Sequence, residues 1–160
     1  KKKPEGKLVN FVAYCLNPNH YHFILEQIVD NGIEKFMHRI GTGYTKYFNN
    51  KNNRIGALFQ GKFKAIHINS NEYLLHVSAY VNLNDKVHQL RSSASKLVKS
   101  RSSWGEYIGN LKEDIGFCKK DIILDQFSKV KNYRDFAESS VKDTIERRET
   151  DKVLATFLLE

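Results

Sequence analysis

The sequence predicts an α+β fold, because a β-hairpin pattern is followed by apolar patterns of helical period. An apolar run from Leu8 to Leu16 is broken by Asn17-Pro18-Asn19, and a second run extends from His20 to Gln27. Two strand-like runs joined by a short polar turn are typical of an antiparallel hairpin. From Gly32 onward the apolar residues recur three and four positions apart instead. We therefore expect an antiparallel sheet with helices packed on it.

The first helix is expected over residues 32–48, with Asp30 or Asn31 as its capping residue. A basic loop follows at Asn49 to Arg54, and a third strand is predicted from Phe63 to Ile68. Asn69-Ser70-Asn71-Glu72 offers a side-chain cap and an acid in the first turn of a second helix. This second helix is expected to end near residue 84.

Residues 92–103 are rich in serine and lysine and lack apolar periodicity, which predicts a flexible basic loop. Helical segments are predicted after it, at Trp104–Ile108, Ile122–Phe127, Tyr133–Ser139 and Val141–Leu159. The expected organisation is a catalytic core at 1–90, a basic Ser-rich loop at 91–103 and a C-terminal helical region at 104–160.

Composition favours a nucleic-acid partner, and because no secretory signal is recognisable in the sequence we expect a cytoplasmic location. The 160 residues carry 26 Lys and Arg against 18 Asp and Glu, a net charge of +8. A basic chain of this size favours a polyanion. No apolar run reaches the roughly 20 residues that span a bilayer, so we expect no membrane insertion. The two cysteines, Cys15 and Cys118, predict no disulfide framework.

Two pairs of side chains carry the candidate chemistry. His20 and His22 are two apart on a strand, so both imidazoles leave the same face and can bind one metal ion. Tyr80 and Asn84 are one turn apart on the second helix. A phenol has an ordinary pKa of about 10 and needs a nearby cation or base to act as a nucleophile. A carboxamide oxygen beside it can share the histidines' cation, which indicates phosphoryl transfer to tyrosine.

Each of these residues also has a purely structural interpretation. A histidine pair on a strand is often hydrogen-bonded and half-buried. Tyr80 borders an apolar arc of its helix, and Asn84 suits a helix C-terminus. The basic segments equally suit a solvated surface.

Four segments of the sequence are similar to the motifs of one family. Tyr14-Cys15-Leu16-Asn17-Pro18-Asn19-His20-Tyr21-His22 is similar to Y-x-L-M-P-N-H-x-H, with Asn17 in the position of Met. Ala79-Tyr80-Val81-Asn82-Leu83-Asn84-Asp85 is similar to R-Y-I-H-L-N-P. The segment from Gly56 to Lys64 is similar to G-x-L-W-x-x-R-[FY]-K, and Ser102 to Tyr107 to W-S-S-Y. The chain thus resembles the single-tyrosine HUH transposases, particularly the REP-associated type.

This resemblance implies a transposase that nicks and rejoins single-stranded DNA at hairpin-forming ends. His20, His22 and Asn84 would be the metal ligands, and Tyr80 the nucleophile that forms a 5′-phosphotyrosine intermediate. The metal would be Mg²⁺ or Mn²⁺. The implied fold is a ferredoxin-like antiparallel sheet with helices packed on it and a C-terminal helical extension.

The chain departs from the family at its start and beside the tyrosine. A strand and a helix of the family are expected ahead of the first residue, so we expect the core to be N-terminally incomplete. Asp85 replaces Pro, and Ala79 replaces Arg.

Six basic residues are the expected DNA contacts: Lys35, Arg39, Lys46, Arg54, Lys62 and Lys64. Tyr47 and Phe59 are expected either to stack on unpaired bases or to lie in the core. The partner would be single-stranded DNA with a hairpin, and a homodimer is a further expectation.

Two other functions fit the sequence less well. The chain could be a catalytically inactive single-stranded nucleic-acid-binding domain derived from such an enzyme. It could also be a zinc-dependent hydrolase using His20 and His22, although only His38, His67, His76 and His88 are available as further histidine ligands.

Overall fold

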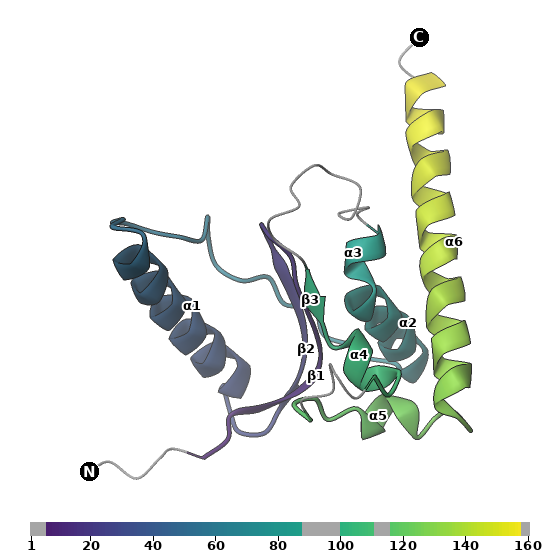
Figure 1. The fold of residues 1–160 in the computed structure, drawn as a ribbon, viewed down its shortest axis with the longest axis horizontal. Coiled ribbons are helices and arrows are strands. Elements are labelled where there is room, and N and C mark those ends of the chain that lie inside the picture. The colour runs from purple at the N-terminus through teal and green to yellow at the C-terminus, as the bar shows by residue number, and fades with distance from the viewer. Residues whose placement is uncertain (1–5, 88–99, 111–115, 158–160) are drawn as a thin grey trace. The chain divides into compact units, whose positions relative to one another are not determined.

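The computed structural model describes residues 6–87, 100–110 and 116–157, with side chains described as far as residue 151. The elements in chain order are β1 (Val9–Leu16), β2 (Tyr21–Gln27), α1 (Gly32–Lys51), α2 (Asn71–Asn82), α3 (Asn84–Val87), β3 (Arg101–Ser102), α4 (Trp104–Tyr107), α5 (Asp121–Leu124) and α6 (Val130–Phe157) (Figure 1). The predicted α+β class is confirmed, with a three-stranded antiparallel sheet, helices packed on it, and helices at the C-terminal end.

The sheet has the strand order β2-β1-β3, so the predicted hairpin forms its first two strands. β3 pairs antiparallel with β1 and places Ser102 opposite Cys15 and Arg101 opposite Leu16. The predicted loop over residues 92–103 is wrong at this end, while most of it lies outside the described residues. Two residues are too short a strand to show any alternation in the sequence.

The predicted strand from Phe63 to Ile68 is absent from the described structure. Its residues have no regular secondary structure, and Ile66 is 77% exposed. An alternating pattern becomes a strand only where a neighbour offers a free edge. Residues 63–68 pair with none of the three strands of the described sheet, whose order is β2-β1-β3.

Helix α1 begins as predicted but without the expected cap. Asn31 precedes it in the left-handed conformation, with φ 57°, and its side chain makes no capping hydrogen bond. Gly32 is required at the next position, because a Cβ there would lie 2.4 Å from the carbonyl oxygen of Leu8. Helix α2, by contrast, has the predicted cap: the Ser70 side chain accepts a hydrogen bond from the backbone N–H of Tyr73.

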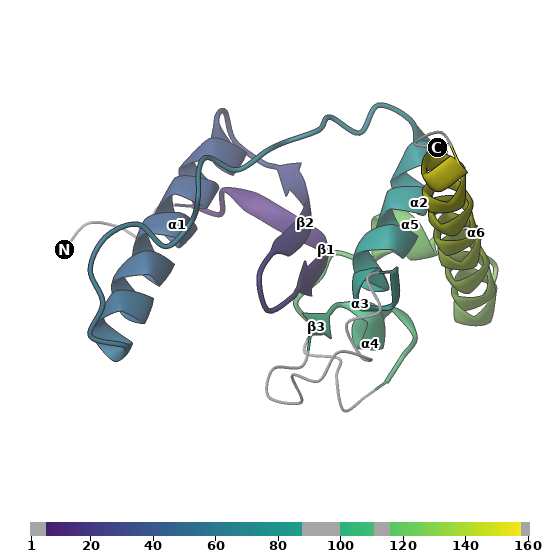
Figure 2. The ribbon, with the colours of Figure 1, turned by 90° about the horizontal axis from the view of Figure 1, so that it is seen from above.

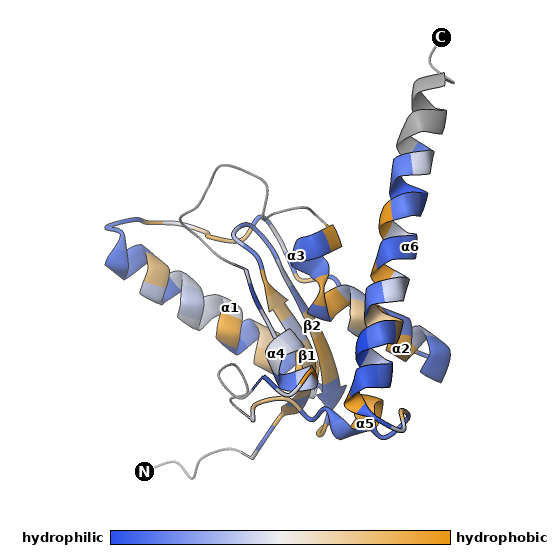
Figure 3. Cartoon of the chain, turned by 45° about the vertical axis from the view of Figure 1, so that its right-hand side comes forward, coloured by the Kyte–Doolittle hydropathy of each residue, from blue (hydrophilic) through white to orange (hydrophobic). Residues whose placement is uncertain are grey.

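The C-terminal helices differ from the prediction mainly in α6, which is one continuous helix where two were expected. Tyr133, Ala137 and Val141 follow one another at four-residue spacing and are buried. Helices α2 and α6 lie side by side in both orientations (Figures 1 and 2). The other side chains of α6 that the structure describes are mostly hydrophilic (Figure 3).

The chain divides into two compact units. The α1 unit comprises Lys1–Asn10 and Leu25–His67, and the α2/α6 unit comprises Phe11–Ile24 and Ile68–Glu160. The division into 1–90, 91–103 and 104–160 expected from the sequence stays a prediction. The tip of the hairpin belongs to the α2/α6 unit, whose core contains residues of β1, β2, α2, α5 and α6.

A buried polar network fixes α2 against β1 in this unit. Asn82, at the end of α2, donates to the hydroxyl of Tyr133 at 2.9 Å and accepts from the hydroxyl of Ser103. The Ser103 hydroxyl in turn accepts from the backbone N–H of Tyr14 at 2.9 Å. Asn82 therefore joins α2 to α6 and, through Ser103, to the strand that leads into the histidine turn.

We expect Asn82→Ala to lower the free energy of unfolding by about 2 to 4 kcal/mol, because it leaves the buried hydroxyls of Ser103 and Tyr133 without this partner. Urea unfolding followed by circular dichroism measures the change. The matched control is Asn132→Ala, which removes one exposed bond to Ser128 and should change stability by no more than about 0.5 kcal/mol. Equal effects of the two substitutions would contradict a clamping role for Asn82.

Candidate active site

The two histidines of the sequence motif lie at the tip of the hairpin, close to each other. The turn between β1 and β2 is closed by a hydrogen bond from the backbone N–H of Asn17 to the carbonyl oxygen of His20, at 2.9 Å. His20 ends the turn, and His22 is the second residue of β2. Their ring centroids are 5.2 Å apart. The two imidazoles therefore lie close together, although His20 precedes β2 and only His22 is a strand residue.

Tyr80 and Asn84 are not on one continuous helix, contrary to the prediction. Helix α2 ends at Asn82, Leu83 follows with φ −115° and ψ 22°, and α3 begins at Asn84. The buried side chain of Leu83 belongs to the core, and its backbone N–H still bonds to the carbonyl of Ala79 at 3.0 Å. The chain therefore bends at Leu83 and continues, and the bend directs Asn84 toward the hairpin.

Asn84 reaches His20 across this unit. Its side-chain oxygen Oδ1 lies 3.3 Å from Nε2 of His20, and the residue is fully buried. On the other side of the ring, Nδ1 of His20 lies 2.6 Å from Oδ1 of Asn19. Because an amide oxygen only accepts, Nδ1 carries the proton and Nε2 presents a lone pair. Asn19 therefore holds His20 in the tautomer that suits a metal ligand.

A third side chain, that of Asn17, joins these two ligand atoms. Its amide nitrogen Nδ2 donates to Nε2 of His20 at 2.8 Å and to Oδ1 of Asn84 at 2.7 Å. Its oxygen Oδ1 accepts from the Ser100 hydroxyl at 2.8 Å and from the Cys15 thiol at 3.5 Å. Burial raises the pKa of that thiol to about 11; the charge of Asp85 also raises this pKa, while a hydrogen bond with the backbone of Asp85 lowers it. Cys15 therefore stays protonated at neutral pH and keeps its donor.

The donor atoms at this point fit a metal ion. Two neighbouring ligands of an octahedral ion, each about 2.1 Å from it, are about 3 Å apart, and the atoms of His20 and Asn84 are 3.3 Å apart. An imidazole nitrogen with an amide oxygen is a mixed donor set that suits Mn²⁺, while Mg²⁺ favours the oxygen. Among the described residues, the buried amide nitrogen of Asn84 has no hydrogen-bond partner. The fold thus directs the side-chain oxygen of Asn84 toward His20 and leaves the side-chain nitrogen without a hydrogen bond.

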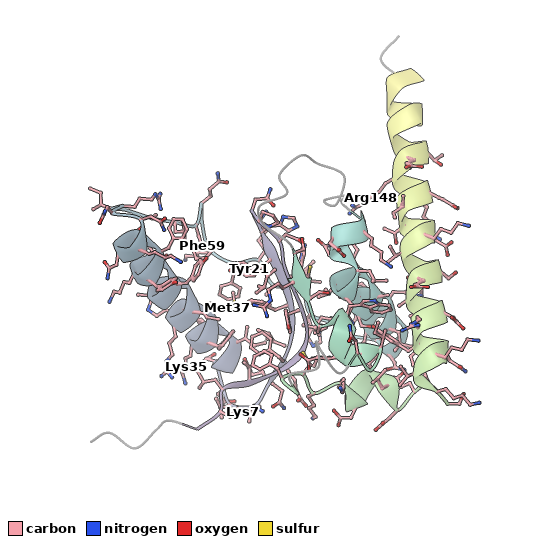
Figure 4. All side chains as sticks on the ribbon, in the orientation of Figure 1. Lys7, Tyr21, Lys35, Met37, Phe59 and Arg148 are labelled. Atoms are coloured by element: carbon pink, nitrogen blue, oxygen red, sulfur yellow. The ribbon has the colours of Figure 1, made fainter. Side chains whose placement is uncertain are left out.

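Tyr80 lies beside two groups, the ring of His22 and the positively charged guanidinium of Arg148. The ring centroids of Tyr80 and His22 are 5.6 Å apart. From α6, the guanidinium of Arg148 lies 5.7 Å from the centre of the Tyr80 ring, and its Nη2 donates to the Tyr80 hydroxyl at 3.4 Å. Figure 4 labels Arg148 where it leaves α6 on the side of α2. The hairpin, α2, α3 and α6 therefore meet around one group of residues within a single compact unit.

The six predicted DNA-binding residues all lie in the other unit and are all exposed: Lys35, Arg39, Lys46, Arg54, Lys62 and Lys64. Lys35 and Arg39 line one hollow of the α1 unit, together with Gly6, Leu8 and Val29. The guanidinium of Arg54 also supports its own loop by donating to the carbonyl of Ala57 at 3.1 Å.

Aromatic side chains accompany these charges on the α1 unit. The ring of Tyr44 lies 6.2 Å from that of Tyr47 and 6.3 Å from that of Phe59, which Figure 4 labels. Tyr47 is 57% exposed and Phe59 is 36% exposed, so neither is a buried core residue of the described structure. Of the two interpretations that the sequence left open, exposure favours base stacking.

The remaining histidines do not complete a zinc site in the described structure. His76 packs on Phe136 and bonds to the Ser140 hydroxyl at 2.8 Å. His38 and His67 belong to the α1 unit, and residue 88 lies outside the described residues. In the described ranges, no three His, Cys, Asp or Glu side chains are placed to hold a metal ion. Nor does any helix there have the length and apolar character to cross a membrane.

Sequence reasoning missed the roles of Asn17 and Arg148. Asn17 was visible as a departure from the family motif, and a polar side chain next to two candidate ligand residues was a usable signal. Arg148 sits on a hydrophilic helix 68 residues beyond Tyr80, and no local pattern distinguishes it from Arg147. Only the packing of α6 against α2 singles it out.

Comparison with known proteins agrees with the motifs. The family model described as "Transposase IS200 like" matches residues 2–84, which is just over half of the chain and includes His20, His22, Tyr80 and Asn84. Neither the search of curated proteins nor the search of solved structures finds a match. The match confirms the resemblance seen in the motifs: the chain belongs to the IS200-like transposase family.

Proposed function

We propose that this transposase is a metal-dependent, single-tyrosine enzyme that cleaves and rejoins single-stranded DNA at hairpin-forming ends. The observation that carries the proposal is the meeting of two histidines, an amide oxygen and a tyrosine within one compact unit: His20, His22, Asn84 and Tyr80. The proposed chemistry therefore needs the residues of one chain only. A homodimer stays a prediction.

The hydroxyl oxygen of Tyr80 attacks the phosphorus of a phosphodiester. A bond forms between this oxygen and phosphorus, the bond from phosphorus to the 3′ oxygen breaks, and the phenolic proton passes to solvent. The 3′ oxygen takes up a proton and leaves as a hydroxyl, so the DNA is held as a 5′-phosphotyrosine. Attack by a 3′-hydroxyl reverses the step, and one phosphodiester is exchanged for another without an external energy source.

His20, His22 and Asn84 are the residues that would hold Mg²⁺ or Mn²⁺. When bound, such an ion would neutralise charge on the scissile phosphate and orient it. Asn19 fixes the His20 ring in the metal-binding tautomer, and the bend at Leu83 directs Asn84 to the same point. These contacts orient two of the proposed ligands before any substrate binds.

The α1 unit supplies the proposed DNA-binding surface. Its exposed lysines and arginines would contact phosphates, and the exposed rings of Tyr44, Tyr47 and Phe59 would stack on unpaired bases. Phosphate contacts release counterions, so binding to single-stranded DNA should weaken steeply as salt rises.

The test is a covalent-adduct assay. The full chain is incubated with a pool of hairpin-bearing single-stranded DNAs and Mn²⁺, and a parallel sample receives EDTA. A protein–DNA adduct that survives denaturation and is absent with EDTA supports the proposed enzyme. Salt-sensitive binding without an adduct on any hairpin supports the inactive binding domain instead.

We expect Arg148→Ala to slow adduct formation by about 10- to 100-fold, since the guanidinium stabilises negative charge that develops on the Tyr80 oxygen. Arg148→Lys should recover part of the rate, because it keeps the charge but loses the planar contact with the ring. The matched control is Arg147→Ala, on the next residue of α6. If Arg147→Ala and Arg148→Ala slow the reaction equally, the contact with Tyr80 has no special role.

A further inference from the structure

The Asn17 side chain makes four hydrogen bonds at the candidate metal site. Both protons of its amide nitrogen are used, one on His20 and one on Asn84, at 2.8 and 2.7 Å. Both acceptor positions of its oxygen are used as well, by Ser100 and Cys15. No functional role for this residue follows from the motif, in which its position is occupied by Met.

The amide nitrogen sits where two lone pairs converge. With the proton of His20 on Nδ1, the Nε2 of His20 and the Oδ1 of Asn84 are both acceptors, and at 3.3 Å they repel each other unless a positive partner lies between them. The N–H groups of Asn17 are that partner. A cation held by the same two atoms must therefore take the place of the Asn17 nitrogen.

The Ser100 hydroxyl and the Cys15 thiol allow the amide of Asn17 to exchange the positions of its oxygen and nitrogen by rotation. The oxygen faces a hydroxyl and a thiol, and each of these groups can either donate or accept a hydrogen bond. If the amide rotates by half a turn, the nitrogen faces Ser100 and Cys15 and finds acceptors there. The oxygen then faces His20 and Asn84, where a cation needs a ligand. Lysine or leucine at this position could not serve both sides in this way.

We propose that Asn17 is a further metal ligand, which rotates its amide so that its oxygen replaces its nitrogen at the site when Mg²⁺ or Mn²⁺ binds. The proposal rests on the proposed function, because it assumes that His20, His22 and Asn84 hold the ion. It assigns Asn17 two successive tasks: its nitrogen keeps the ligand atoms together, and its oxygen then joins them on the ion.

Mn²⁺ titration followed by electron paramagnetic resonance tests the proposal without DNA or activity. The free-ion signal gives the dissociation constant for the chelator-treated full chain. Asn17→Leu keeps the approximate size of the side chain and removes its oxygen, and we expect it to weaken Mn²⁺ binding about 10-fold or more. Asn17→Asp restores an oxygen ligand and adds charge, so it should bind Mn²⁺ at least as tightly as the unsubstituted protein. Asn132→Leu, at an exposed position on α6, is the control for the substitution itself.

The sign of the effect separates the proposal from its alternatives. Tighter binding by Asn17→Leu would show that Asn17 only competes with the ion, and unchanged binding would show that it has no part in the site; either result overturns the proposal. Circular dichroism establishes that Asn17→Leu is folded, and Asn17→Asp provides a second measurement if it is not. If the unsubstituted protein binds no Mn²⁺, the proposed metal requirement fails as well. If it binds Mn²⁺ and Asn17→Leu binds equally well, only the role of Asn17 fails.

Discussion

Tyr80→Phe is expected to abolish the covalent adduct, with a loss of at least about 1,000-fold in the rate of its formation. The substitution removes only the hydroxyl that would attack the phosphodiester. Because the Tyr80 ring is partly exposed and its edge contact with His22 is made by the ring, we expect folding and Mn²⁺ binding to stay unchanged. Denaturing gel electrophoresis with labelled hairpin DNA measures the loss.

Tyr73→Phe is the matched control for this substitution. Tyr73 lies on the same helix, two turns before Tyr80, and is 38% exposed. Its loss should leave the adduct at full level. If the adduct persisted in Tyr80→Phe and disappeared in Tyr73→Phe, the nucleophile would be Tyr73 and the assignment of Tyr80 would be wrong.

His20→Ala is expected to raise the Mn²⁺ concentration needed for half-maximal adduct formation by at least about 100-fold. The imidazole supplies one ligand atom and also holds the Oδ1 of Asn84 in place through the shared contact with Asn17. Its loss therefore weakens two of the proposed ligands. The measurement is a titration of adduct yield with Mn²⁺ at fixed DNA concentration.

His76→Ala provides the control for the histidine, because His76 bonds to Ser140 and is not one of the proposed metal ligands. It should leave the Mn²⁺ midpoint unchanged. If His20→Ala lowered the yield at every Mn²⁺ concentration without moving the midpoint, His20 would act on the DNA or on Tyr80 and not on the metal.

The parts of the fold that were predictable are those fixed by contacts close in sequence. The hairpin follows from a polar turn between two apolar runs, and the start of α2 from the Ser70 cap. β3 was not predictable, because its two residues become a strand only when β1 offers an edge. Residues 63–68 show the opposite case: they have the sequence pattern of a strand but pair with no strand of the described sheet.

The candidate site divides in a similar way. The spacing of two residues predicted that His20 and His22 lie close together, and the family motifs then indicated Tyr80 and Asn84 as their partners. The bend at Leu83 could not be read from residues that suit a helix equally well on both sides of it. Arg148 depends on the docking of α6 beside α2, which joins segments far apart in the chain.

We propose that Tyr80 forms a 5′-phosphotyrosine at a site that contains His20, His22 and Asn84. The most direct measurement uses one hairpin DNA labelled either at its 3′ end or at its 5′ end, followed by proteolysis of the adduct and mass spectrometry. If this proposal holds, only the 3′ label stays with the protein, and the nucleotide is found on the peptide containing Tyr80. Retention of the 5′ label, or attachment to any residue other than Tyr80, would contradict it.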